Sequence, residues 1–367
     1  MGVILDAIGI EIEGLYGTRD EIHHFIMSTL GGTNYLSAIH KDASVETPVT
    51  MIRGVGLINL PHRFKKEIRN TTLGYEIVTN PLSLSDMEIF IPKVLIGLQR
   101  FGERFSPRTS IHIHVGFPES LSILKRGLKL GAMLDPLLFR LAGLGNPFRG
   151  EINSSIFCRP LSAAPFILGE DSGRKFQLNP LRGMDAKTMS DFWKGYFISY
   201  GNDYERYHPA RYFAWNLYSV LLRGTLEFRY FNLCLNPEWI LTMINLCQSI
   251  TELAVTSDLP DIPVLDPFSE YKDSVYEDII ERLLSTIKNS DMLYKGILFR
   301  KETLLKILYS TPKPDFGKKK VLSHMQRAYP DRILERFSLE STKENIPNSG
   351  FINIHSANVA DAAELLI

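Results

Sequence analysis

Residues 110–116 read Ser-Ile-His-Ile-His-Val-Gly, and this stretch decides the fold expected of the chain. Aliphatic and polar residues alternate along it with the two-residue period of a half-buried β-strand. The imidazoles of His112 and His114 therefore share one face of the strand, and the aliphatic side chains share the other. The pattern predicts a sheet that packs on helices with its apolar face and carries histidines on the opposite face.

Three further segments, Gly9–Leu15, Tyr75–Thr79 and Thr225–Leu233, read as strands that carry acidic residues. Their charged residues are Glu11 and Glu13, then Glu76, then Glu227 with Arg229. Glu-x-Glu and His-x-His pairs among strong strand formers are typical of ligands for hard cations. Each pair alone also fits a solvated strand edge, a structural histidine or a salt-bridge network. Their joint occurrence predicts a polar sheet face that binds metal.

A turn and a capped helix follow each of these strands. The helix-start signals are Thr18 with Glu21, Ser85 with Glu88, Ser120, and Asn236 followed by Pro237. Each signal supplies a side chain that accepts hydrogen bonds from the free N–H groups of a first helical turn. This order of strand, turn and helix predicts an α+β fold in which helices cover the apolar face of an antiparallel sheet.

The remaining sequence divides into a loop-rich insertion and a helical C-terminal part. Residues 143–187 are rich in glycine, proline and polar residues, which predicts long loops. The later signals are a capping box of Ser274 with Glu277, the periodic segments Lys301–Leu308 and Val321–Phe337, and the polar tail Ser338–Ala357. We therefore expect one domain at residues 1–258 and a helical C-terminal lobe at residues 259–367.

The composition is that of a globular protein. Of 367 residues, 44% are hydrophobic, and 41 basic residues balance 41 acidic ones. A chain with no net charge has no overall field that favours nucleic acid or an anionic membrane surface. The longest apolar stretch, Pro237–Val255, is interrupted by polar residues, and the first residues lack a signal-peptide pattern. Three irregularly spaced cysteines suit a reducing compartment, so we expect a cytoplasmic protein.

As a set, five segments of the sequence resemble the amidoligase family. They are GIEIEG at Gly9–Gly14, KDAS at Lys41–Ser44, GYEIVTNPL at Gly74–Leu82, SIHIHVG at Ser110–Gly116 and TLEFRYFN at Thr225–Asn232. The family is similar to glutamine synthetase and glutamate–cysteine ligase. The resemblance implies an ATP-dependent carbon–nitrogen ligase whose catalytic domain is residues 1–258. It also implies a curved antiparallel sheet of the glutamine synthetase type, with two or three Mg²⁺ or Mn²⁺ ions on its concave face.

The resemblance assigns metal ligands by position. These are Glu13 and Glu76 for the metal nearer the acceptor carboxylate, and Glu11, His112 and Glu227 for the metal between the nucleotide phosphates. Related ligases often carry a further acid a few residues after the position of Glu76, and this chain has none before Asp86. Water or Asp42 is therefore left as the third ligand of the first metal.

The resemblance also implicates residues in catalysis and in binding. They are Arg229, His114 and Arg211 for catalysis, Arg206 and Arg229 for the nucleotide, and Asp42, Ser44 and Asn216 for substrate. Arg229 is expected to face the transferring phosphoryl group, and His114 to lie near substrate or phosphate. Residues 143–187 and 200–209 are the candidates for a loop that covers the site.

The implied chemistry suits these residue types. A carboxylate is a poor acyl donor, and transfer of the γ-phosphoryl group of ATP activates it as an acyl phosphate that an amine attacks. Such a transfer depends on positioning and charge neutralisation, which divalent metals and arginine supply. Amino acids, peptides or a protein are expected to provide the carboxylate and the amine.

Two other functions stay open from the sequence. A metal-dependent hydrolase could use the same glutamates and histidines to activate water. A non-catalytic module could use them to hold a structural metal or a polar network. The chain lacks a Gly-x-x-x-x-Gly-Lys phosphate loop and a Gly-x-Ser-x-Gly nucleophile turn, which argues against P-loop ATPases and serine hydrolases.

Overall fold

The computed structural model describes eight strands and nine helical segments over part of the chain. The described residues are 7–17, 24, 27–28, 35–41, 73–100, 110–142, 158, 160–161, 166–171, 174–178, 180–196, 209–232, 234, 236–256, 259–265, 271–289 and 301–310. The strands are β1 (Ile8–Gly17), β2 (Leu36–Lys41), β3 (Leu73–Thr79), β4 (Ser110–Gly116), β5 (Phe166–Asp171), β6 (Arg174–Leu178), β7 (Trp215–Asn216) and β8 (Thr225–Asn232). The helices are α4 (Leu84–Arg100), α5 (Leu121–Ala142), α7 (Met189–Tyr196), α8 (Tyr218–Arg223), α9 (Pro237–Thr256), α10 (Asp273–Asn289) and α12 (Lys301–Ser310), with the 3-10 helices η3 (Pro180–Asp185) and η4 (Pro209–Tyr212).

Six of these strands form one antiparallel sheet in the order β2-β3-β1-β4-β8-β7. Every neighbouring pair in it runs antiparallel. The four strands predicted from alternation, β3, β1, β4 and β8, lie side by side in its middle. The predicted α+β class and antiparallel sheet are therefore confirmed, whereas the specific likeness to glutamine synthetase stays a prediction.

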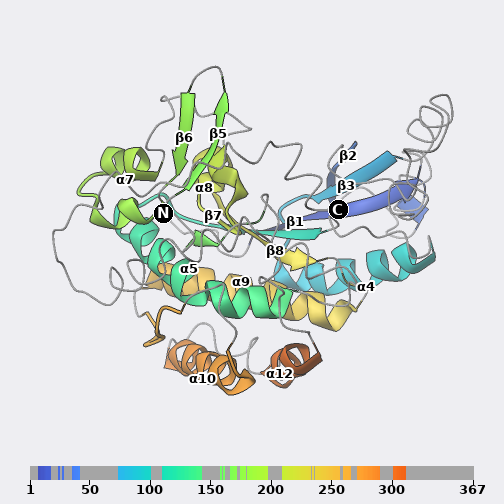
Figure 1. Cartoon of the computed structure of the whole chain (residues 1–367). Coiled ribbons are helices and arrows are strands. Elements are labelled where there is room, and N and C mark those ends of the chain that lie inside the picture. The colour runs from blue at the N-terminus through green and yellow to red at the C-terminus, as the bar shows by residue number, and fades with distance from the viewer. Residues whose placement is uncertain are drawn as a thin grey trace, which may run out of the picture.

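Five of the described helices lie in layers on one side of this sheet, whereas α8 lies on the other side (Figure 1). Helices α4, α5 and α9 lie below it, and α10 and α12 form a further layer beneath them. The aliphatic residues of the central strands face these helices and are buried; they include Ile10, Ile12, Ile111, Ile113 and Val115. Burying one such side chain contributes about 1.5–3 kcal/mol, so this interface stabilises the fold.

The observed start of one helix agrees with the cap predicted from the sequence, and the start of another differs from its predicted cap. Asn236 Oδ1 accepts hydrogen bonds from the N–H groups of Glu238 and Trp239, as predicted for the cap of α9. The capping box of α4 consists of Ser83 and Asp86, not of Ser85 and Glu88. The prediction was wrong by two residues because Leu82 still pairs with Ile8 of β1, which makes Ser83 the first residue free to turn.

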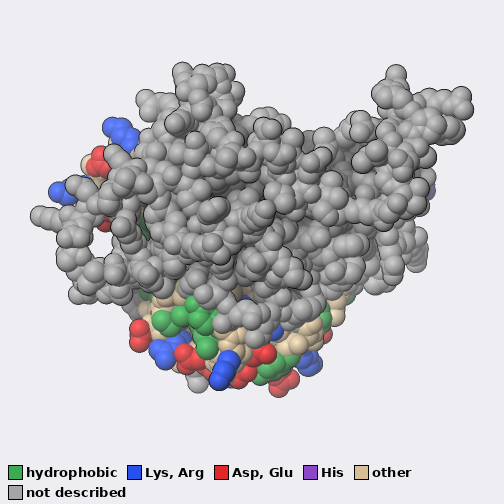
Figure 2. All heavy atoms as spheres, in the orientation of Figure 1, with side chains coloured by type: hydrophobic (Ala, Val, Ile, Leu, Met, Phe, Trp, Pro, Cys, Tyr) green, Lys and Arg blue, Asp and Glu red, His purple; other side chains and the backbone are tan. Residues whose placement is uncertain are grey.

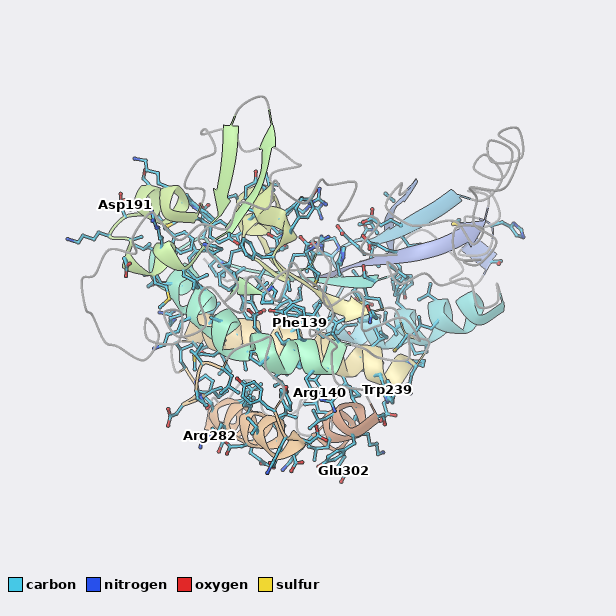
Figure 3. All side chains as sticks on the ribbon, viewed as in Figure 1. Phe139, Arg140, Asp191, Trp239, Arg282 and Glu302 are labelled. Atoms are coloured by element: carbon cyan, nitrogen blue, oxygen red, sulfur yellow. The ribbon has the colours of Figure 1, made fainter. Side chains whose placement is uncertain are left out.

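Side-chain contacts fix the helical layers to one another. Arg126 of α5 donates to the carbonyls of Ala254 and Val255, the last turn of α9, at 2.8 and 2.9 Å. A guanidinium at this position satisfies free carbonyls and suits the negative end of the helix dipole. Arg140, labelled in Figure 3, connects α5 to Asp273 of α10 at 3.2 Å.

The region after residue 258 contains the helices α10 and α12, near the segments that the sequence predicted to be helical. Helix α10 begins at Asp273, so Ser274, predicted as its cap, lies within its first turn. The helix expected over Val321–Phe337 and the polar tail lie outside the described residues. On the face seen in Figure 2, the described side chains carry both charge signs in close proximity. Among the described helices, none has the length and hydropathy to cross a membrane.

Part of the insertion at residues 143–187 differs from the loops expected there. Strands β5 and β6 pair as an antiparallel hairpin, with Asp171 opposite Arg174. The glycines of this stretch were interpreted as a loop, but a two-residue hairpin connection also requires small and polar residues. The hairpin stands on the side of the sheet away from α5 and α9 (Figure 1).

Replacement of Gly131 by alanine is expected to destabilise the protein by about 1–3 kcal/mol, because overpacking forces rigid groups apart. Gly131 of α5 packs against β7, and an added Cβ would lie 2.7 Å from the Trp215 ring and 2.8 Å from Leu161. Urea unfolding measures the effect. Lys129→Ala on the exposed side of the same helix is the control, with an expected change within about 0.5 kcal/mol. An unchanged midpoint for Gly131→Ala would contradict the packing described.

Candidate functional site

Strand pairing places the predicted polar residues opposite one another on the sheet face away from α4, α5 and α9. The cross-strand pairs are Glu11 with His112, Glu13 with Glu76, and His114 with Glu227. Directly paired residues have Cβ atoms about 4.5–5.5 Å apart, so their side chains interact. Segments that are far apart in the sequence thus form one cluster.

The side chains of this cluster are buried although they are polar or charged. The members with less than one tenth of their surface exposed are Glu11, His112, His114, Glu227 and Arg229. Charged groups leave water only where partners compensate for the lost hydration. The cluster therefore depends on the contacts among its members.

His112 lies at the centre of the cluster. Its Nδ1 atom is 3.1 Å from Glu11 Oε2 and 3.6 Å from Glu227 Oε1. Its Nε2 atom is 3.0 Å from the Ser110 hydroxyl, which in turn donates to Glu13. One imidazole thus connects carboxylates from β1 and β8.

Glu227 has two strong donors. Arg229 Nη1 lies 2.5 Å from Glu227 Oε1, and Asn216 Nδ2 of β7 lies 2.6 Å from Oε2. Burial raises the pKa of the Glu227 carboxyl, but the positive charge of Arg229 and the proximity of His114 outweigh burial and lower the pKa to about 2. Glu227 therefore carries its negative charge at neutral pH.

Glu11 contacts Arg223, a residue that the sequence analysis did not select. Arg223 Nη1 lies 2.5 Å from Glu11 Oε1. Burial raises the pKa of Glu11, but its contacts with His112 and His114 outweigh burial and hold the pKa well below its usual value. Arg223 ends α8 next to Gly224, whose φ of 68° closes the helix. A basic residue in the last turn of a helix is readily explained by its favourable interaction with the helix dipole. The sequence therefore gave no sign that Arg223 contacts Glu11.

Strand β8 has a bulge opposite His112, and two neighbouring residues beside it point to opposite faces of the sheet, as strand alternation requires. Ile111 pairs with Phe231 and Ile113 with Phe228, so two β8 residues lie opposite His112. Arg229 faces the cluster, whereas the Tyr230 hydroxyl donates to the buried Asp135 of α5. Bulges are common next to active sites.

Glu11, His114 and Glu227 could hold one divalent cation. Each offers a ligand atom, and these atoms lie within 4.8 Å of one another. His114 Nε2 is buried and has no hydrogen-bond partner among the residues that the structure describes, although Glu11 Oε1 lies 3.3 Å away. Carboxylates and imidazole suit Mg²⁺, Mn²⁺ or Zn²⁺. The donor set thus fits a divalent ion, and the histidine in this group is His114, whereas the resemblance assigned His112 to the metal.

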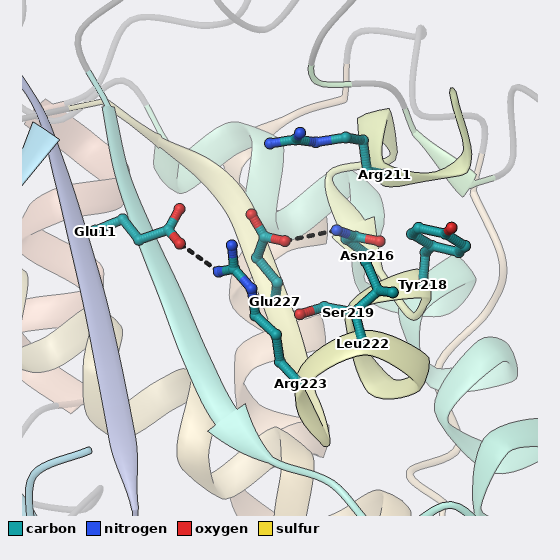
Figure 4. A pocket seen from close by; sticks show the side chains of 8 residues that line it. All are labelled: Glu11, Arg211, Asn216, Tyr218, Ser219, Leu222, Arg223 and Glu227. Carbon is teal, nitrogen blue, oxygen red and sulfur yellow. Dashed lines mark hydrogen bonds and ion pairs between the residues drawn. The ribbon is translucent and has the colours of Figure 1, made fainter. Parts of the chain in front are cut away.

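A pocket of about 290 Å³ adjoins this group (Figure 4). Its lining consists of Glu11, Arg211, Asn216, Tyr218, Ser219, Leu222, Arg223 and Glu227. In Figure 4 the Arg223 side chain reaches from α8 toward the space between Glu11 and Glu227, and Arg211 enters from η4. The pocket combines two guanidinium groups with two carboxylates, which suits a charged ligand.

The structure brings together seven of the residues that the sequence selected. They are Glu11, His112, His114, Arg211, Asn216, Glu227 and Arg229. Glu13 joins them through Ser110, and half-buried Glu76 lies opposite Glu13. The predicted Asp42, Ser44 and Arg206 lie outside the described residues, as does most of the expected covering loop at residues 200–209.

Comparison with known proteins identifies the family. The sequence model of the family described as "Putative amidoligase enzyme" matches residues 6–251. A search of curated proteins finds no match. The matched region contains every strand of the six-stranded sheet and the whole cluster around His112. Because this match spans well over half of the sequence, the chain belongs to the amidoligase family.

Proposed function

We propose that the chain is an ATP-dependent carboxylate–amine ligase, which forms an amide bond through an acyl phosphate. The observation that carries the proposal is a group of three side chains that could hold a cation, Glu11, His114 and Glu227, on a buried sheet face. Family membership supports a ligase. We propose amino acids, peptides or a protein as the sources of carboxylate and amine.

In the first proposed step, a substrate carboxylate oxygen attacks the γ-phosphorus of ATP, and ADP leaves. In the second step, the amine nitrogen attacks the acyl carbon, phosphate departs and the nitrogen loses a proton. Mg²⁺ or Mn²⁺, when bound, supplies positive charge that neutralises phosphate oxygens. Glu11, His114 and Glu227 would hold that ion, since their ligand atoms are already grouped.

Arg229 is the proposed partner of the transferring phosphoryl group. Its guanidinium is buried and held by Glu227. Burial lowers the pKa of Arg229, but the charges of Glu227 and Glu13 outweigh burial and raise it, so the group stays protonated. A fixed positive charge stabilises the negative charge that develops on a transferring phosphoryl group.

Asn216 is proposed to bind the amine substrate. It donates its amide N–H to Glu227, and its carbonyl oxygen is buried without a hydrogen-bond partner among the described residues. An unpaired buried acceptor costs about 1–3 kcal/mol, which an N–H of the substrate would recover. Asn216 also lines the pocket beside Glu227.

A metal-dependent hydrolase is the second candidate, because a group of two carboxylates and one imidazole also suits the activation of water. The two functions differ in their need for a nucleotide. A ligase consumes ATP as it forms the amide, whereas a hydrolase cleaves an amide without ATP.

Purified protein is expected to release ADP from ATP in the presence of Mg²⁺, a carboxylate substrate and an amine substrate. A coupled assay over a panel of amino acids and peptides measures this release, and mass spectrometry identifies the amide. Release should fall to background when Mg²⁺ is chelated. Nucleotide-independent cleavage of a peptide, together with no ADP release from any mixture, would favour the hydrolase and exclude the ligase.

A further inference from the structure

Arg223 and the candidate cation share one atom of Glu11. Arg223 Nη1 lies 2.5 Å from Glu11 Oε1, and the same oxygen lies 3.3 Å from His114 Nε2. Glu11 and His114 are two of the three grouped cation ligands. The guanidinium therefore lies directly beside the position that the group would use to bind a divalent ion.

The two arginines of the cluster differ in their freedom to move. The side chain of Arg223 is 46% exposed, whereas that of Arg229 is 9% exposed. Both donate to a buried glutamate of the cation group. Arg223 can turn its guanidinium into solvent or into the adjoining pocket, while Arg229 is enclosed.

Electrostatic attraction explains why the Arg223 guanidinium contacts the Glu11 carboxylate in the structure. Partial burial lowers the pKa of Arg223, but the charges of Glu11, Glu227 and Glu76 outweigh burial and raise it. A divalent ion next to Glu11 would cancel this attraction and repel the guanidinium, because like charges a few ångströms apart interact strongly at a partly buried site. The ion and Arg223 are therefore alternatives at the same carboxylate.

We propose that Arg223 is an exchangeable counter-cation of Glu11, which a divalent ion displaces when it binds Glu11, His114 and Glu227. The inference rests on the metal site of the proposed function and adds a residue that limits metal affinity. Removal of the guanidinium should strengthen cation binding, because the ion then has no competitor to displace.

Isothermal titration of the full chain with Mn²⁺, without nucleotide or substrate, tests the exchange. Arg223→Gln is expected to bind Mn²⁺ about fivefold more tightly than the unmodified protein, the size expected for loss of a partly exposed ion pair. Arg282→Gln is the matched control, since the Arg282 side chain is 44% exposed and pairs with Asp278 on α10. Figure 3 places Arg282 on the far side of the helical layers. Its replacement should leave Mn²⁺ affinity unchanged.

Equal or weaker Mn²⁺ binding by Arg223→Gln would overturn the exchange, as would the absence of Mn²⁺ binding by every variant. A second measurement uses the unmodified protein and so does not depend on the folding of a variant. In side-chain ¹⁵N NMR, the signal of the Arg223 guanidinium should shift as Mg²⁺ is added. A signal that saturating Mg²⁺ leaves in place would also overturn the exchange. If the unmodified protein releases ADP but Arg223→Gln binds Mn²⁺ with unchanged affinity, only this inference is contradicted. If Arg223→Gln binds Mn²⁺ more tightly but no substrate mixture yields ADP, only the proposed ligase is contradicted.

Discussion

Replacement of Glu227 by glutamine is expected to lower the rate of Mg²⁺-dependent ADP release by about 100-fold or more, as loss of a key electrostatic group commonly does. Glu227 carries a full negative charge at neutral pH, since its pKa is about 2. Glutamine has nearly the same shape and could keep the contact with Asn216. It removes the charge that would bind the proposed cation and that holds Arg229.

Glu302→Gln provides the matched control for this replacement. Glu302 is an exposed residue of α12, on the side of the molecule away from the cluster (Figure 3). Its replacement removes the same charge and should leave ADP release unchanged. Circular dichroism gives the folded fraction of each variant, so that rates are compared per folded molecule. A Glu227→Gln protein with full activity would exclude Glu227 from the proposed mechanism.

Replacement of Asp135 by alanine is expected to destabilise the fold by about 3 kcal/mol, because two buried donors lose their acceptor. Asp135 is fully buried in α5 and accepts hydrogen bonds from the Tyr230 hydroxyl and from Leu161 N–H, the latter at 2.7 Å. The melting temperature should fall by roughly 6–12 °C for a domain of this size. Differential scanning calorimetry measures the change.

Asp135→Asn separates the hydrogen bonds from the charge. Asparagine keeps one oxygen that can accept the N–H of Leu161 and fills nearly the same volume. Its loss of stability should therefore be clearly smaller than that of the alanine variant. If both variants melted at the temperature of the unmodified protein, Asp135 would have no part in holding β8 on α5.

Asp135 also bears on how β8 is positioned. Tyr230 follows Arg229 directly, at the bulge opposite His112. The Cys158 thiol donates to the Arg229 carbonyl at 3.1 Å, and burial raises the pKa of this thiol to about 12, so Cys158 serves as a neutral packing group and not as a nucleophile. Contacts beneath the sheet thus hold the backbone of β8 on either side of the bulge.

Local patterns were sufficient for the features that depend on neighbours in the chain. The two-residue alternation of β1, β4 and β8 identified which side chains share a face, because a strand sends successive side chains to opposite sides. Asn236 was recognised as a cap because its partners are only two and three residues away. The cap of α4 was misplaced because a distant contact, between Ile8 and Leu82, decides where that helix begins.

Residues whose role depends on distant partners were not recognised. Arg223 and Glu11 are 212 positions apart, and Tyr230 and Asp135 are 95 apart. Arg223 resembles an ordinary basic residue at a helix end, and Asp135 an ordinary acid within a helix. Their contacts follow from how α8 and α5 pack on the sheet, which no sequence window contains.

Local periodicity and side-chain chemistry were enough to predict the class of the fold, the polar side of each central strand and the kinds of ligand atoms on it. The tertiary structure decided which acid meets which base. Strand order places β1 between β3 and β4, and the pairing register places Glu11 opposite His112 and Glu227 opposite His114. Pairing energies that act between distant segments select that register, and a shift of one residue would reverse every face.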